Sequence, residues 1–267
     1  MGKITLQILV VVGIFLGIWF VFSQIDFVKM LHLNKISKRM EDKIGEVIME
    51  TIEKTNKIGK RDEGGEILDK IKERLCEGAA INKRDIHVHL VESSEINAFA
   101  LPGNHLVVYT GLIKRCDSVS ELCGVMAHEI GHLQLKHVMK RLAGKMGITV
   151  LASVVTNGNS EVVGNIIELL SSSAFERKQE AEADAFAVDC LHRAHINQEG
   201  FSNFMLKIAE IHSAVPEVME WISSHPDSRK RAEEIRTLAS KKGATKHTEV
   251  ISEADWQELK DAAANLN

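Results

Sequence analysis

The sequence has few cysteines and no CxxC pair. The 267 residues include four cysteines, which are scattered along the chain as Cys76, Cys116, Cys123 and Cys190. This spacing excludes a zinc ribbon and a disulfide-dense scaffold. We expect buried free thiols, with at most one disulfide. Internal repeats and low-complexity tracts are also missing, and the length fits one substantial core.

A long positively charged stripe is missing as well. Lys and Arg total 33, Asp and Glu total 37, and the formal net charge is -4, with the two signs interspersed. Proteins that hold a phosphate backbone gather basic residues on one face or along one helix. Nucleic acid is therefore not an expected partner.

An uncharged apolar run, from Ile8 to Phe22, lies close to the N-terminus. Its length is between that of a signal-peptide core and that of a full membrane span. We predict that residues 1–25 are an uncleaved anchor that contacts the membrane through residues 4–22, or alternatively a signal segment. The basic residues after the run favour, taken literally, a cytoplasmic domain, but this rule is weakest where a long domain follows a short N-terminal tail.

The rest of the chain is predicted to be one α+β domain, mostly helical, over residues 26–240. A polar segment, 241–267, is predicted to be a peripheral helical tail with a loose linker. Apolar periodicity and turn residues define the expected elements. They are two amphipathic helices within 26–76, strands near 86–90 and 106–110, a helix over 120–142, a helical hairpin over 148–170, helices over 175–192 and 198–214, and a charged helix from Ser228.

The strongest chemical signal is the sequence His128-Glu129-Ile130-Gly131-His132. Helix positions four residues apart differ by about 40° in azimuth, so the two histidines can bind one metal ion. Glu129 lies about 100° from His128, where it can act as general base. Such a string arises by chance in about one chain in a hundred of this length, so it needs a third ligand nearby.

Acidic residues on a later predicted helix offer that third ligand. Glu176, Glu180 and Asp184 are spaced by one turn and share a face. A solvated acidic face is the alternative, but the alanines between them favour close helix packing and hence a site. Glu182 differs from Glu180 by about 200°, so we expect it to face away from the metal and to matter little.

Four stretches together resemble the zinc metalloendopeptidase family of HtpX and the CAAX prenyl endopeptidases. Order and spacing agree over about residues 92–235. The stretches are residues 97–103, residues 128–132, residues 180–184, and His225-Pro226 with Arg231. The sequence predicts no second membrane span, and in this respect the chain is more similar to the single-anchor or periplasmic members of that family.

The resemblance implies one Zn²⁺ per chain, held by His128, His132 and Glu180. It implies that Asp184 orients a zinc-binding histidine. It also implies a catalytic role for His225, which with Arg231 steadies the developing oxyanion.

For the substrate, the resemblance implies that Asn97, Ala98 and Phe99 border a cleft where a peptide adds as a strand. The expected fold is zincin-like, with a small sheet flanking the HExxH helix. The expected function is a membrane-associated endopeptidase that acts on protein or peptide substrates in protein quality control, with its domain in the cell envelope or periplasm. The alternative is a zinc-containing, chaperone-like module that binds unfolded envelope proteins and hydrolyses little.

Overall fold

The computed structural model describes residues 37–59, 64–157, 160–211, 219–243 and 246–266. The predicted membrane anchor, with its apolar residues 4–22, lies outside this range. Among the residues that are described, no helix is both long enough and apolar enough to span a membrane.

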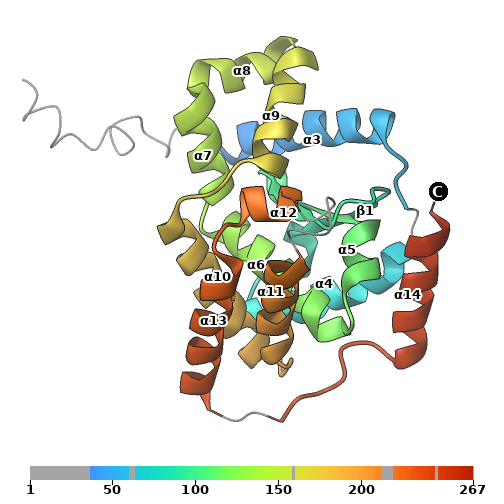
Figure 1. Ribbon diagram of the computed structural model, residues 1–267. Helices are drawn as coiled ribbons and strands as arrows, with labels where there is room; N and C mark the ends of the chain where they lie inside the picture. Colours follow the sequence, from blue (N-terminus) through green and yellow to red (C-terminus); the bar gives the residue numbers. More distant parts are fainter. Residues whose placement is uncertain (1–36, 60–63, 158–159, 212–218, 244–245, 267) are drawn as a thin grey trace, which may run out of the picture. The chain divides into compact units, whose positions relative to one another are not determined.

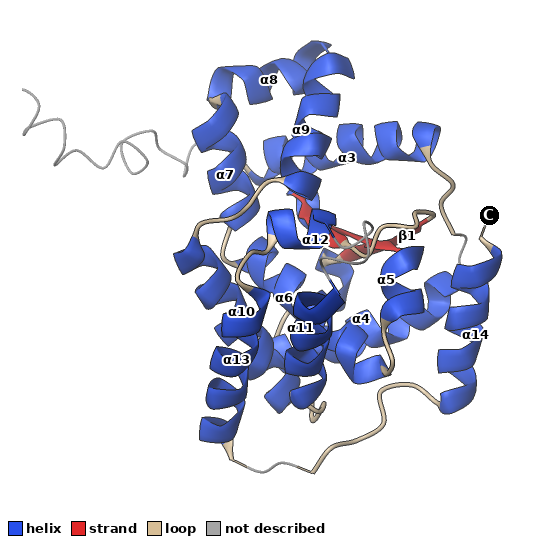
Figure 2. Ribbon diagram, viewed as in Figure 1, coloured by secondary structure: helices blue, strands red, loops and turns tan. Residues whose placement is uncertain are grey.

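Helices dominate the described residues, as predicted (Figures 1 and 2). Two short 3₁₀ helices, η3 (Lys83–Asp85) and η4 (Pro102–Asn104), accompany them. The α-helices are α3 (Lys38–Thr55), α4 (Glu66–Ala79), α5 (Thr110–Arg115), α6 (Val119–Gln134), α7 (His137–Met146), α8 (Ile148–Asn157), α9 (Ser160–Ser172), α10 (Arg177–Arg193), α11 (Glu199–Ile211), α12 (Met219–Ser224), α13 (Ser228–Lys242) and α14 (Glu253–Asn265).

A small mixed sheet confirms the α+β prediction. Its strands are β1 (His87–Val91), β2 (Ala98–Leu101) and β3 (His105–Tyr109), in the order β1-β3-β2. Strand β3 pairs parallel with β1 and antiparallel with β2. The sequence did not predict β2, because all four of its side chains are buried and its apolar run shows no alternation.

Helices cover the sheet on both sides. In Figure 1, α3, α8 and α9 lie above the sheet, and α4, α6 and α11 lie below it. Helix α3 packs closely on η4, since a Cβ atom added at Gly45 would lie 2.1 Å from the carbonyl oxygen of Pro102. On the other side, Ala98, Leu106 and Val108 join the main hydrophobic core. The sheet is therefore enclosed, and β2 forms one of its edges.

Helix α6 is the centre of the core. Its N-terminus is capped by Ser118, whose hydroxyl accepts a hydrogen bond from the backbone N–H of Glu121, and every residue from 121 to 133 is buried. The prediction of one helix over 120–142 was wrong. Lys136 adopts a left-handed conformation with φ 60°, which ends α6 and starts α7 in a new direction at His137.

The C-terminal helix belongs to the same core. Trp256, Leu259 and Ala263 of α14 are buried in the main hydrophobic cluster, and Lys70 of α4 pairs with Asp255 at 3.0 Å. Helix α14, which lies in the predicted tail 241–267, therefore packs on the same core as the helices before it. All four cysteines are free and buried, which confirms the interpretation of their scattered positions.

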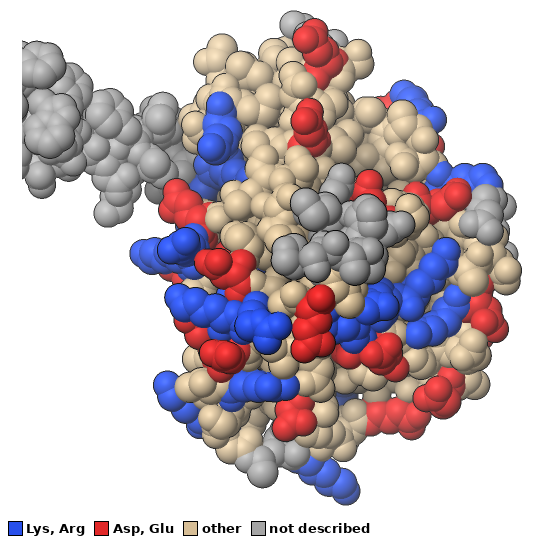
Figure 3. All heavy atoms as spheres, in the orientation of Figure 1, with Lys and Arg blue, Asp and Glu red and all other residues tan. Residues whose placement is uncertain are grey.

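The surface carries charges of both signs. Figure 3 shows basic and acidic side chains interspersed on the visible face, with few charges over α8 and α9. Helix α8 has no charged residue, and Val150 on this helix is 36% exposed. The hairpin that the sequence predicted over 148–170 is thus present and has an uncharged first helix.

Candidate active site

Helices α6 and α10 pack side by side and carry the predicted metal ligands (Figure 1). Their contact is close because small residues meet there: a Cβ atom added at Gly131 would lie 3.3 Å from the Cα atom of Ala183. Ala183 is fully buried. The predicted close packing of α10 is confirmed, and it brings Glu180 toward the two histidines of α6.

Four donor side chains converge between these helices and the segment before α13. The ligand atoms of His128, His132, Glu180 and His225 all lie within 4.8 Å of one another, and all four residues are buried. The Nε2 atoms of the two α6 histidines are 3.0 Å apart, and Glu180 Oε1 lies 3.3 Å from His132 Nε2. His225 Nδ1 lies 3.1 Å from Glu180 Oε2. The structure thus adds His225 to the side chains that could hold an ion.

Asp184 and Arg231 support this cluster from the side of α10. Asp184 Oδ1 lies 3.0 Å from Nδ1 of His128, the ring nitrogen that points away from the cluster. Arg231 donates two hydrogen bonds to Asp184, at 2.8 Å to Oδ2 and 2.7 Å to Oδ1, and it also pairs with Glu180. The bidentate pair fixes the Asp184 carboxylate, and the contact with Glu180 links it to the donor cluster.

Electrostatics favour an anionic carboxylate beside neutral and cationic imidazoles. Burial opposes ionisation of Glu180, but His225 and Arg231 outweigh it and hold the pKa of that carboxyl well below its usual range. Burial also lowers the pKa of His132 to about 4, so this ring keeps a free lone pair at neutral pH. Burial opposes protonation of His225, but the carboxylates of Glu180 and Glu129 raise its pKa to about 9.

Glu129 lies next to the cluster and outside the donor set. Its side chain is 1% exposed, and Oε2 accepts a hydrogen bond of 3.1 Å from the backbone N–H of Ala100 in β2. Oε1 lies 3.3 Å from Nε2 of His225. Glu129 therefore connects the donor cluster with the edge strand of the sheet.

The predicted substrate residues are all buried. Asn97 is 0% exposed, Ala98 0% and Phe99 3%. The side chain of Asn97 donates to the backbone carbonyl of Ser171 at 3.3 Å, and Phe99 packs edge-on against Tyr109. The side chains of this stretch therefore face the protein interior.

His132 is contacted by Phe175 and His137, which were not predicted to belong to the site. The Phe175 ring stacks on the His132 ring at a centroid distance of 3.9 Å, and Nδ1 of His137 lies 3.1 Å from Nδ1 of His132. In a continuous helix, His137 would lie about 140° from His132, but the break at Lys136 turns it back. Glu182 lies outside the donor cluster, but its Oε2 lies 3.1 Å from Nε2 of His137, a contact that the sequence did not predict.

The donor set fits a zinc ion. Catalytic zinc takes imidazole nitrogens and carboxylate oxygens from three protein side chains and leaves a further position open. His128 and His132 turn one ring nitrogen each toward Glu180 and use the other nitrogen for contacts outside the cluster. The buried histidines and the glutamate thus face one another in the geometry that a divalent cation needs.

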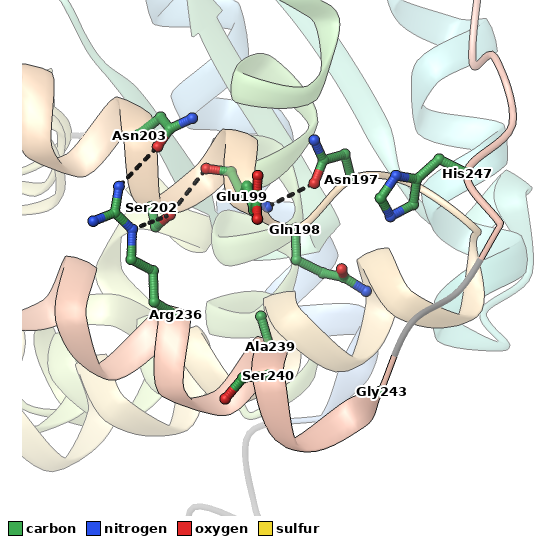
Figure 4. Close-up of a pocket in the computed structure, with 10 residues that line it drawn as sticks. All are labelled: Asn197, Gln198, Glu199, Ser202, Asn203, Arg236, Ala239, Ser240, Gly243 and His247. Carbon is green, nitrogen blue, oxygen red and sulfur yellow. Dashed lines mark hydrogen bonds between the residues drawn. The ribbon is translucent and has the colours of Figure 1, made fainter.

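A separate polar pocket, of about 550 Å³, lies near the start of α11 and the end of α13 (Figure 4). Asn197, Glu199 and His247 line it, and Arg236 donates to Asn203 at 3.1 Å. None of the predicted site residues lines this pocket. It is therefore distinct from the HExxH cluster.

The fold and the cluster define a zincin-like metallopeptidase with its HExxH helix beside a small sheet. The sequence profile described as peptidase family M48 matches residues 64–239. This range covers all the predicted site residues and more than half of the chain. The chain belongs to peptidase family M48, and the predicted family resemblance is confirmed.

Several characterised proteins are similar to this chain. Metalloprotease LoiP of Escherichia coli (strain K12) is 30% identical over 173 residues, which cover 62% of this chain and 68% of LoiP. The mitochondrial metalloendopeptidase OMA1 of Bos taurus is 28% identical over 166 residues, 57% of this chain and 32% of OMA1. The beta-barrel assembly-enhancing protease of Yersinia pestis is 29% identical over 183 residues, 61% of this chain and 38% of that protein. The matched part of the chain therefore covers less than two fifths of the length of the last two relatives.

Proposed function

We propose that this member of family M48 is a zinc-dependent endopeptidase that binds one Zn²⁺ through His128, His132 and Glu180. The observation that carries the proposal is the buried convergence of these donor atoms with Glu129 beside them. A bound zinc ion supplies the Lewis acidity that polarises the scissile carbonyl and lowers the pKa of water toward neutrality.

Glu129 is the general base in this proposal. Burial opposes its ionisation, but His225, His132 and His128 outweigh burial and lower the pKa of Glu129. It is therefore a carboxylate at neutral pH, and it can take a proton from the attacking water at Oε1. The same carboxyl then delivers that proton to the leaving amine.

Asp184 and His225 have different roles in the proposal. Asp184, fixed by Arg231, lies 3.0 Å from Nδ1 of His128, where its negative charge favours a proton on Nδ1 and leaves the opposite nitrogen free for the metal. Burial opposes protonation of His225, but without a bound metal ion the carboxylates of Glu180 and Glu129 raise its pKa to about 9. We assign it the donation of a hydrogen bond to the developing oxyanion, with Arg231 adding positive charge nearby.

The substrate is proposed to bind along β2. This strand is an edge of the sheet, and the N–H of Ala100 points toward Glu129 instead of toward β3. An extended peptide that pairs with this edge would have its backbone beside the general base. Asn97, Ala98 and Phe99 would then contribute through the backbone and by holding the strand in place.

Anchoring by residues 4–22 and a domain in the cell envelope are part of the proposal. The uncharged run from Ile8 to Phe22 supports the anchor. The name of the Yersinia pestis relative refers to the assembly of β-barrels, which in bacteria are outer-membrane proteins, and this supports the envelope and a role in protein quality control.

Zinc analysis combined with casein digestion tests the proposed function, with wild type compared to Glu129→Gln. We expect about one zinc per chain in both proteins and hydrolysis only in the wild type, because the substitution removes a base and no ligand. Equal hydrolysis by the two proteins would contradict the mechanism. Zinc binding without hydrolysis by the wild type would instead favour the chaperone-like alternative.

A further inference from the structure

The outer ring nitrogens of the two α6 histidines face different groups. His128 meets a carboxylate directly, since its Nδ1 lies 3.0 Å from Oδ1 of Asp184. Nδ1 of His132 instead lies 3.1 Å from Nδ1 of His137. The other ring nitrogen of His137, Nε2, lies 3.1 Å from Oε2 of Glu182. A chain of three side chains thus leads away from the donor cluster.

This chain runs from the buried centre to the surface. His137 is 1% exposed, and its ring lies 5.1 Å from the His132 ring between centroids. The side chain of Glu182 is 42% exposed, and its other oxygen lies 3.8 Å from Nζ of Lys178. His137 is thus a buried imidazole held between a metal-site histidine and a partly exposed carboxylate.

The protons of the chain can be assigned from one requirement. A ring nitrogen that binds a metal is unprotonated, so a His132 that binds through Nε2 carries its proton on Nδ1. That N–H donates to Nδ1 of His137, which must itself be unprotonated. His137 therefore carries its proton on Nε2 and donates it to Glu182. Each contact in the chain then has one donor and one acceptor.

Removing Glu182 would release this arrangement. His137 would then be free to carry its proton on Nδ1, where it would face the Nδ1–H of His132. Two donors would meet at the 3.1 Å contact, and one of the rings would have to turn. Partners of this kind set the orientation and the basicity of a metal-binding imidazole.

We propose that His137 and Glu182 are positioning residues for His132, and that they do for this ligand what Asp184 does for His128. The inference rests on the proposed zinc site and extends it beyond the residues that hold the ion. It gives Glu182 a role although its carboxylate lies outside the donor cluster.

Pairs of substitutions separate this role from simple packing. His137→Leu removes the acceptor for His132, whereas His137→Asn keeps an oxygen or nitrogen close to the position of Nδ1. Glu182→Ala removes the terminal carboxylate, whereas Glu182→Gln keeps an acceptor. Lys178→Ala is the matched control, because Lys178 is 84% exposed and contacts Glu182 without touching the chain of rings.

Zinc affinity of the full chain, measured by competition with a chelator, is the first readout. We expect His137→Leu and Glu182→Ala to weaken zinc binding by about 10 to 100 fold. His137→Asn, Glu182→Gln and Lys178→Ala should stay close to the wild type. Thermal melting of the metal-free variants checks folding. If His137→Leu does not fold, Glu182→Ala tests the proposal, because Glu182 is partly exposed.

The second readout needs no metal. Long-range ¹H–¹⁵N spectra of the metal-free protein report which ring nitrogen of each histidine is protonated. We expect His137 to be protonated on Nε2 in the wild type and to become a mixture of tautomers in Glu182→Ala.

The proposal would be overturned if His137→Leu and Glu182→Ala fold and bind zinc as tightly as the wild type does. It would also be overturned if His137 of the wild type is protonated on Nδ1. A wild type that binds no zinc would contradict the proposed function instead, and the tautomer spectrum would still decide the role of Glu182.

Discussion

Replacing Phe175 with leucine should destabilise the metal-free protein more than an ordinary buried Phe→Leu change. The Phe175 ring is sandwiched, with the guanidinium carbon of Arg141 4.3 Å from its centroid and the His132 ring stacked at 3.9 Å. Arg141 is buried, and it donates to the carbonyls of Leu169 and Ser173 near the end of α9. Burial lowers the pKa of Arg141 to about 10, so the side chain is still a cation at pH 7.

The magnitude follows from these two contacts. A desolvated cation–π contact contributes about 2 kcal/mol, and a stacked ring pair contributes about 0.5–1.5 kcal/mol beyond burial. The leucine variant should therefore lose about 2.5–3.5 kcal/mol from these contacts. Phe204→Leu is the control, because Phe204 is also buried and its aromatic contact, with Trp221, involves no cation.

Urea unfolding of the metal-free proteins is the assay, with Arg141→Met combined with Phe175→Leu in a double-mutant cycle. The cycle isolates the Arg141–Phe175 contact, for which we expect a coupling free energy of about 2 kcal/mol. A coupling below about 0.5 kcal/mol, or equal losses for Phe175→Leu and Phe204→Leu, would refute this reasoning.

Three further predictions concern the metal, the thiols and the membrane. Glu180→Ala should abolish tight zinc binding, and Asp184→Ala should weaken zinc affinity or activity by about 10 to 100 fold, as measured by zinc content and peptide turnover. Burial raises the pKa of Cys76 to about 11 and that of Cys190 to about 12, so these thiols should resist iodoacetamide at pH 8 and react only on unfolding or as the pH approaches those values. The full chain should sediment with membranes and need detergent because of residues 8–22, and loss of the domain when intact spheroplasts are treated with protease would agree with its proposed place in the envelope.

Most of the helices and the central donors could be predicted because their signals are local. His128, Glu129 and His132 lie within one helical turn, and the one-turn spacing of Glu180 and Asp184 can be read from the sequence alone. The ends of α10 and the start of α13 also lie close to their predicted positions.

The parts that could not be predicted depend on tertiary packing. Strand β2 has no alternation, because both of its faces are buried. The role of His137 depends on the left-handed Lys136, which no apolar period reveals. The composition of residues 241–267 is polar, yet Trp256 and Leu259 of α14 pack on the core. The sequence does not reveal that this part of the core needs a further helix to cover it. In each case a distant partner decides the structure.

Diffraction at the zinc absorption edge, on crystals of the zinc-loaded protein, tests the central claim most directly. We predict one anomalous peak, bonded to ring nitrogens of His128 and His132 at about 2.0–2.1 Å and to Glu180 at about 2.0–2.2 Å. A main peak elsewhere, for example at His89 and His105, whose ring nitrogens lie 2.8 Å apart, would contradict the account.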